Sequence, residues 1–344
     1  MHCTLLIPGL FWPRETAAAV LRGLELPALT KLLARARSQH FPAITPEGWL
    51  CQSFEVGRQH DWPLAPLTLE LDGGVAGDAY WLRSDPVHIK IERNRLTVVE
   101  STSFDLEVDE ADALVHALNQ QFSADGMTFF AYACKRWYLK LSRVPNVMTR
   151  ALSEVAGRDV RGLLPTGSES MAWHRIFNES QMLLHDHPVN AAREERGEAA
   201  VNSVWLWGGG TRPPVRGRAF SHVWSDDVSA TALGAAAGAD TAALPSDGAT
   251  LLQSAGGETG TSSHLVVLDG LDRATAFQDA ETWRERLAAM EARWFGPLVS
   301  ALQRGRIEGI AVVVPGAAPC CRFDAARTDL YKVWRSVKPL SAYA

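Results

Sequence analysis

The chain lacks several features that would point directly to a function. Its 344 residues carry a formal net charge of −5, so there is no overall positive charge to attract nucleic acid or an anionic membrane. No stretch supplies the roughly 18 consecutive apolar residues that a membrane span needs. The start of the chain lacks the cationic segment, long apolar run and small-residue cleavage site of a secretory signal. We therefore expect a cytoplasmic globular protein that binds neither nucleic acid nor membranes.

Cysteine and phosphate-loop patterns are also missing. The five cysteines are scattered, and the adjacent pair Cys320 and Cys321 lacks the C-x-x-C spacing of a zinc or redox site. We interpret all five as reduced thiols. Three glycines, Gly208 to Gly210, are not followed by the Gly-Lys-Ser/Thr of a P-loop. Neither a structural metal nor a P-loop nucleotide site is indicated.

The residues that are present favour an α/β protein. A hydrophobic content of 47% over this length allows a sizeable core and two domains. Short apolar runs alternate with amphipathic segments, which is typical of a parallel sheet flanked by helices. We expect Asp109 to cap a helix that ends at Phe122, and Ala239 to Ser263, rich in small residues, to form a surface loop. The expected strands are 5–7, 96–99, 265–269 and 310–314, and further helices are expected at 27–37, 225–238 and 279–295.

Residues 173–214 join a helix to a tryptophan-rich strand. The helix pattern ends near His185, and the run Val204 to Trp207 has the apolar density of a buried strand. His185 and His187 resemble a metal pair, but alternate positions at a helix end point in different directions. We therefore expect His187 to cap a helix that starts at Pro188. The three glycines after the strand allow the backbone to approach another chain segment or a ligand closely.

These motifs carry a resemblance to a known family. The sequence HPVN at 187–190, followed by VNSVWLWGGG at 201–210, resembles the end of the inserted cap domain in archaeal-type cofactor-independent phosphoglycerate mutases, members of the alkaline-phosphatase superfamily. With LLIPGL, GDAYWLRSDPVHIK, KRWYLKL and DLYKVWRSVKPL, the pattern also resembles a bacterial family labelled regulatory protein, RpfE type. The resemblance implies an alkaline-phosphatase-like core from residues 1–74 and 213–344, with a mainly parallel sheet flanked by helices. Residues 75–212 would form an inserted α/β cap domain.

The resemblance also implies a test of the chemistry. Enzymes of this superfamily hold two divalent metals with Asp and His at the ends of core strands and use a Ser or Thr nucleophile. In this chain Ile7-Pro8-Gly9 stands where the mutases have an Asp-Gly motif, and Pro315-Gly316 stands where they have an Asp-His pair. Glu47 or Gly48 takes the place of the nucleophile. We therefore expect no metal or other cofactor and no metal-dependent catalysis.

An active enzyme stays open as an alternative. A metal-dependent phosphoglycerate mutase or related phosphotransferase, using Mn or Mg, would need ligands at positions displaced from the family pattern. Asp269, Asp272 and His264 are the nearest candidates for its catalytic residues.

In the mutases, cap arginines grip the phosphate and carboxylate of a small acid, a role suited to the guanidinium fork. Three of the corresponding arginines also have structural interpretations. Arg93 and Arg95 flank the turn former Asn94 and suit a solvated hairpin. Arg83 is flanked by large apolar residues and must find a partner, for which Asp85 is the nearest candidate. By position, the candidate ligand-binding residues are Arg83, Asp85, His88, Arg93, Arg95, Arg136, Asn190 and Arg193.

Three hypotheses about function follow. The first is a non-catalytic, regulatory phosphoglycerate-mutase-like protein that binds a small phosphorylated or carboxylated metabolite or a protein partner. The second is the active metal-dependent enzyme. The third is a protein-interaction module that uses its aromatic surface, since the chain has 12 tryptophans. Nothing in the sequence sets the oligomeric state.

Overall fold

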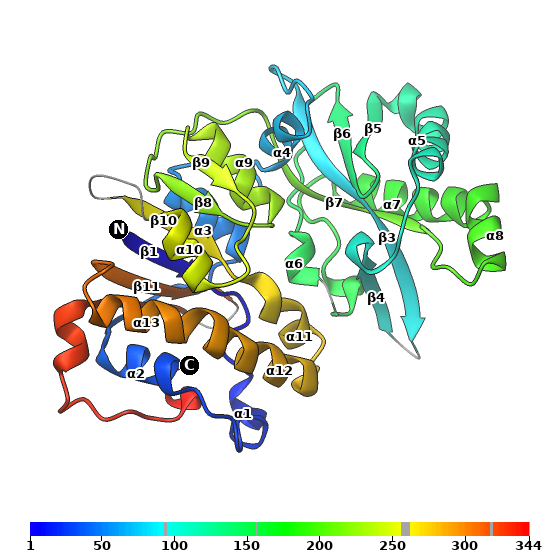
Figure 1. The fold of residues 1–344 in the computed structure, drawn as a ribbon. Coiled ribbons are helices and arrows are strands. Elements are labelled where there is room, and N and C mark those ends of the chain that lie inside the picture. The colour runs from blue at the N-terminus through cyan, green and yellow to red at the C-terminus, as the bar shows by residue number, and fades with distance from the viewer. Residues whose placement is uncertain (93–94, 156, 256–261, 317–318, 344) are drawn as a thin grey trace. The chain divides into compact units, whose positions relative to one another are not determined.

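A computed structural model describes residues 1–92, 95–155, 157–255, 262–316 and 319–343. It divides into two compact units, the first made of Met1–Phe54 with Gly217–Ala344 and the second of Glu55–Arg216 (Figure 1). The second unit is therefore an insertion in the sequence of the first. The boundaries expected from the resemblance, residues 75 and 212, both lie inside this inserted unit.

The first unit is built on a seven-stranded sheet in the order β2-β12-β11-β1-β10-β8-β9. The five strands from β11 to β9 are parallel, and β12 and β2 continue the sheet in antiparallel pairing. This arrangement confirms the mixed α/β class and its mainly parallel sheet. The strands are β1 (His2–Leu6), β2 (Arg37–Phe41), β8 (His222–Trp224), β9 (Asp240–Ala242), β10 (Ser263–Val267), β11 (Gly309–Val314) and β12 (Cys320–Ala326).

Helices pack on both faces of this sheet. The larger core lies between one face and α2, α10, α12 and α13, which contribute buried leucines and the fully buried Trp283. On the other face, Gly234 of α9 lies against Val223 of β8, and α3 packs against α9. The helices are α1 (Arg14–Val20), α2 (Pro27–Arg35), α3 (Pro46–Ser53), α9 (Val228–Ala236), α10 (Gly248–Ser254), α11 (Asp272–Ala276), α12 (Ala280–Met290) and α13 (Gly296–Gln303). A π-helical turn (Glu291–Phe295) joins the last two, and 3-10 turns lie at Asp269–Leu271, Arg327–Tyr331 and Leu340–Ala342.

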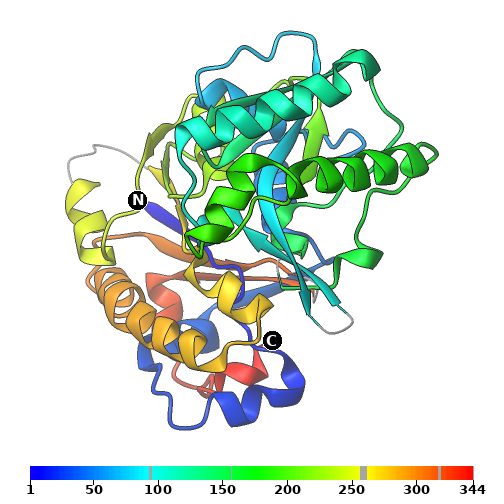
Figure 2. The ribbon, with the colours of Figure 1, turned by 90° about the vertical axis from the view of Figure 1, so that its right-hand side faces the viewer.

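The inserted unit contains an antiparallel sheet in the order β4-β3-β6-β5, with β7 also paired to β3. Helices α5 and α7 cover one face of this sheet (Figure 2) and bury Leu114, Leu118 and Ile176 against its strands. The strands are β3 (Tyr80–Glu92), β4 (Arg95–Glu100), β5 (Met127–Ala133), β6 (Arg136–Leu141) and β7 (Ser203–Gly210). The helices are α4 (Ala65–Leu71), α5 (Val108–Phe122), α6 (Leu152–Val155), α7 (Ser170–His185) and α8 (Pro188–Glu195), with 3-10 turns at Ser101–Ser103, Ser123–Asp125 and Val160–Gly162.

The joint between α7 and β7 folds as the sequence indicates. His187 caps α8, with its Nδ1 accepting a hydrogen bond from the backbone N–H of Val189 at 3.2 Å. Strand β7 is buried along its whole length. A Cβ on Gly210 would lie 2.4 Å from the Cβ of Pro63, so glycine is required there by close approach of a neighbouring chain segment.

Two local expectations from the sequence are wrong. The stretch from Ala239 to Ser263 is not a surface loop, because it contains β9 and α10, and Leu251 and Leu252 of α10 are buried in the core. Residues 256–261 of that stretch lie outside the described residues. Asp109 does not cap α5, because a capping box formed by Glu107 and Glu110 starts the helix earlier.

Within the described ranges, no helix combines the length and apolar character needed to cross a membrane.

Candidate functional site

The end of β1 offers a backbone turn where the mutase pattern has a carboxylate. Gly9 has φ of +71°, and a Cβ there would lie 2.9 Å from the carbonyl oxygen of Leu271. Its own carbonyl accepts hydrogen bonds from Thr275 Oγ1 at 2.9 Å and Trp283 Nε1 at 2.8 Å. The Pro8-Gly9 turn is thus fixed by packing and by two hydrogen bonds, and it provides no side chain for a metal.

Carboxylates do follow the neighbouring strands β8 and β10, and two of them hold backbone N–H groups. Asp227 caps α9 by accepting from the N–H of Ala230 at 2.8 Å, and Asp226 accepts from the N–H of Leu244 at 3.1 Å. Desolvation by the surrounding protein, together with the negative charges of Asp227 and Asp226, raises the pKa of Asp269 to about 6. Part of the Asp269 residue is still exposed to solvent.

Hard divalent cations need several ligands that meet at one point. Across the described ranges, no three His, Cys, Asp or Glu side chains are grouped to hold a metal ion. The described side chains at this edge of the sheet therefore do not fit the pair of metals that the sequence resemblance implies.

The three catalytic candidates from the sequence are not brought together. Asp269 and Asp272 follow the carboxyl end of β10, whereas His264 lies near its amino end and is fully buried. His264 Nδ1 accepts from Trp224 Nε1 at 3.0 Å, and its ring stacks on His222 with centroids 4.6 Å apart. His264 is held as a core histidine, remote from the two carboxylates.

The region that replaces the nucleophile is the start of α3. Thr45 caps this helix, with its Oγ1 accepting from the N–H of Gly48 at 3.0 Å. Glu47 and Gly48 occupy the first turn, and neither has a hydroxyl.

In the inserted unit, Arg83 is buried in a polar and aromatic cluster. Its side chain is 4% exposed and binds Asp85 through Nε at 3.1 Å and Nη2 at 2.6 Å. Its guanidinium also lies 5.4 Å from the ring of Tyr138 and 5.2 Å from that of Trp207. Trp207 Nε1 donates to the second oxygen of Asp85 at 2.7 Å. The expectation that Arg83 pairs with Asp85 is confirmed.

Arg136 lies beside this cluster and is held by Asp72. Its Nε and Nη2 bind the two oxygens of Asp72 at 2.9 and 2.5 Å, and Tyr138 donates its hydroxyl to the same carboxylate at 2.6 Å. Partial burial works against ionisation of Asp72, but these hydrogen bonds hold its pKa below the usual value.

Asn190 and Arg193 form a separate network around α8. The Asn190 side chain bonds to the backbone of Leu184 and Val201, which ties the helix to the start of β7. Arg193 is 1% exposed and binds Glu110 of α5 at 2.5 Å. Both side chains therefore serve as internal connectors.

The remaining ligand-binding candidates are dispersed. His88 Nδ1 lies 2.8 Å from the carbonyl of Ala200, and Arg95 is exposed at the start of β4. Arg93 lies outside the described residues. The structure thus brings Arg83, Asp85 and Arg136 together, and a ligand-binding role for any of the eight residues stays a prediction.

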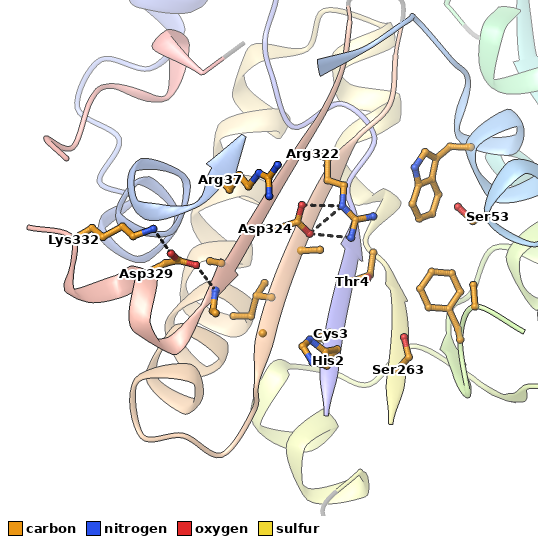
Figure 3. Close-up of a pocket in the computed structure, with 18 residues that line it drawn as sticks. His2, Cys3, Thr4, Arg37, Ser53, Ser263, Arg322, Asp324, Asp329 and Lys332 are labelled. Carbon is orange, nitrogen blue, oxygen red and sulfur yellow. Dashed lines mark hydrogen bonds and ion pairs between the residues drawn. The ribbon is translucent and has the colours of Figure 1, made fainter. Parts of the chain in front are cut away.

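A pocket of about 660 Å³ lies on the face of the first unit's sheet that carries His2, Thr4 and Arg322 (Figure 3). We name it the open-face pocket. Trp49 and Ser53 of α3 form one side, and the remaining polar lining comes from Arg37, Ser263, Asp324, Asp329 and Lys332.

Two of the three Arg and Lys side chains in this pocket are paired with a carboxylate. Arg322 binds Asp324 at 2.9 Å, and Lys332 pairs with Asp329 (Figure 3). Arg37 projects from the edge strand β2 and has no hydrogen-bond or ion-pair partner among the described residues. The pocket therefore holds one positive charge more than these two carboxylates neutralise.

This pocket was not predicted from the sequence. Arg322 and Asp324 alternate with the buried Cys321 and Phe323, a pattern that places both charges on one face of a strand. That alternation was a usable signal, but the partners on β1, β2 and α3 are far away in sequence.

Comparisons with known proteins find phosphoglycerate mutases among the relatives of this chain. No model of a known protein family matches the chain. Over 118 residues, 34% of this chain, the sequence is 30% identical to 2,3-bisphosphoglycerate-independent phosphoglycerate mutase 2 of Methanothermobacter thermautotrophicus and covers 29% of it. A probable 2,3-bisphosphoglycerate-independent phosphoglycerate mutase of Geobacter sulfurreducens is 25% identical over 152 residues, 44% of this chain and 38% of that protein.

Solved structures give a likeness in fold. The PH0037 protein of Pyrococcus horikoshii superimposes with a TM-score of 0.52 at 11% identity, over 94% of this chain and 87% of that one. A cofactor-independent phosphoglycerate mutase from Thermoplasma acidophilum gives a TM-score of 0.46 at 13% identity, over 99% of this chain and 94% of that one. The chain is thus similar to phosphoglycerate mutases at low identity, and its sequence matches to the Methanothermobacter and Geobacter proteins span well under half of each relative's length.

Proposed function

We propose that this protein is a non-catalytic relative of the phosphoglycerate mutases that binds a small phosphorylated or carboxylated hydroxy acid in the open-face pocket. The observation that carries the proposal is the uncompensated Arg37 beside the paired Arg322 and Lys332. A guanidinium without an internal partner favours an anion, because charge-assisted hydrogen bonds to carboxylate or phosphate are strong.

The uncharged lining supports a hydroxylated ligand. The hydroxyls of Thr4, Ser53 and Ser263 face the pocket and have no hydrogen-bond partner within the described parts of the chain. Asp324 and Asp329 are acceptors for the hydroxyl groups of a ligand. A phosphoglycerate, the compound in the names of the relatives, has one phosphate, one carboxylate and one free hydroxyl, which matches this mixture of cations, hydroxyls and acceptors.

We propose binding without turnover because of the side chains at the end of β1 and after the neighbouring strand β8. The turn at Gly9 supplies no ligand, and Asp226 and Asp227 use their carboxylates to hold backbone N–H groups. A protein that retains the metabolite without converting it is suited to a regulatory role, as in the RpfE-type family that the sequence resembles.

Two substitutions with opposite effects test the binding site. In titration calorimetry with 3-phosphoglycerate, Arg322→Ala should raise the Kd about tenfold, since a hydrogen bond to a charged group contributes about 1.5–3 kcal/mol. Asp324→Asn should lower the Kd, because it removes a negative charge beside the anion.

Arg306→Ala is the matched control, since Arg306 is an exposed cation of the same unit that does not line this pocket. Its Kd should equal that of the unmodified protein. Equal affinities for Arg322→Ala and the control, or no binding at millimolar 3-phosphoglycerate, would contradict the proposal.

A further inference from the structure

A second cavity of the first unit is lined by several positive charges and, among the described residues, by no Asp or Glu. Its volume is about 750 Å³, and it is bordered by the start of α1, the end of α2, strand β2 and the C-terminal segment. We name it the basic cleft. The lining residues that matter here are Arg14, Arg37, Trp334, Arg335, Lys338 and Tyr343.

Several of these cations are available to a ligand. Lys338, like Arg37, has an exposed side chain with no hydrogen-bond or ion-pair partner within the described ranges. Arg335 is held in place because its Nη1 donates to the carbonyls of Arg35 and Ala36 at 3.1 and 2.7 Å. Those carbonyls lie at the end of α2, where a helix has no internal donors left. Both bonds use Nη1, so the Nε and Nη2 groups of Arg335 are not engaged by these two carbonyls.

The cleft also presents an aromatic face. Trp334 is 75% exposed although it is a large apolar residue. The backbone N–H of Lys338 donates to the hydroxyl of Tyr343 at 3.1 Å, which ties the segment that carries Trp334 to the end of the chain. An exposed indole beside cations is the combination with which proteins stack a base and hold its phosphates.

We propose that the basic cleft binds a nucleoside polyphosphate, with its phosphates on Arg37, Arg335 and Lys338 and its base stacked on Trp334. The cavity volume lies in the range of small-molecule sites, roughly 300–1,000 Å³. Arg37, Arg335 and Lys338 supply three positive charges for the phosphates, and the described lining residues include no Asp or Glu. The chain as a whole has a net charge of −5, so a longer nucleic acid would meet repulsion beyond the cleft.

Calorimetric titration with ATP and with inorganic triphosphate separates the two parts of the site. Lys338→Ala should weaken both ligands about tenfold, because both carry the phosphates that it contacts. Trp334→Ala should weaken ATP about tenfold and leave inorganic triphosphate unchanged, because only ATP has a base to stack. Arg306→Ala, a matched exposed cation outside the cleft, should leave both affinities unchanged.

The proposal is overturned if ATP fails to bind, if Trp334→Ala weakens both ligands equally, or if a single-stranded oligothymidylate binds more tightly than ATP. Arg322→Ala distinguishes this site from the open-face pocket, since Arg322 does not line the basic cleft. It should leave the Kd for ATP unchanged when 3-phosphoglycerate is absent, which keeps the two ligands from competing for Arg37, a residue that lines both pockets.

Discussion

Replacing Arg83 with Met is expected to lower the free energy of unfolding of the inserted unit by about 3–5 kcal/mol, because it leaves a buried carboxylate without its partner. Asp85 is 3% exposed and, of its hydrogen bonds to side chains of the described residues, would keep the one from Trp207. The stacking of the guanidinium on Tyr138 and Trp207 would be lost as well. Urea unfolding monitored by amide hydrogen exchange in β3 and β7 measures this loss of stability in the two strands that carry the cluster.

Arg95→Ala is the control for this substitution. Arg95 is an arginine of the same unit, exposed at the start of β4, and surface substitutions of this kind usually change stability by less than about 0.5 kcal/mol. If Arg83→Met proved as harmless as Arg95→Ala, the Arg83 and Asp85 pair would not be a structural element of the inserted unit.

Replacing Trp283 with Ala should destabilise the first unit by about 3–5 kcal/mol, the usual cost of removing a large buried aromatic side chain. Trp283 is fully buried, packs against Trp12 with ring centroids 5.3 Å apart, and donates to the carbonyl of Gly9 at 2.8 Å. Its loss would open a cavity and release the turn at the end of β1. Thermal unfolding and denaturant titration both measure the change.

Two comparisons sharpen this test. Trp283→Phe keeps most of the ring but loses the N–H donor, so it should cost less than the alanine change. Trp334→Ala removes the same kind of side chain from a site that is 75% exposed and should alter stability little. A similar loss for Trp283→Ala and Trp334→Ala would be inconsistent with a core centred on Trp283.

Local patterns predicted the elements whose partners are near in sequence. The strands around Leu5, Val266 and Val312, the helix from Pro27 and the cap at His187 follow from apolar spacing and capping chemistry. The small-residue stretch after Ala239 was misread because small residues suit both loops and tightly packed elements. In that stretch, the buried Leu251 and Leu252 and the capping residue Asp247 stabilise the helix α10.

The candidate site could be predicted only in part. The sequence shows that Ile7-Pro8-Gly9, at the end of β1, has no metal-binding side chain. The pairing of Arg83 with Asp85 could be predicted because the apolar neighbours of Arg83 imply burial. The open-face pocket depends on the antiparallel pairing of β2 with β12, which sets Arg37 opposite Asp324 although the two strands are far apart in the chain. Periodicity within each segment contains no information about that register, so the pocket emerged only from the fold.

The central claim, binding without metal-dependent turnover, is tested most directly by assaying conversion of 3-phosphoglycerate to 2-phosphoglycerate with Mn²⁺ while measuring bound metal by elemental analysis. We expect no turnover and no stoichiometric metal, because the turn at Gly9 provides no ligand and no three His, Cys, Asp or Glu side chains of the described residues are grouped to hold a metal ion. Two bound metals per chain together with turnover that Asp269→Asn abolishes would contradict this claim and favour an active mutase.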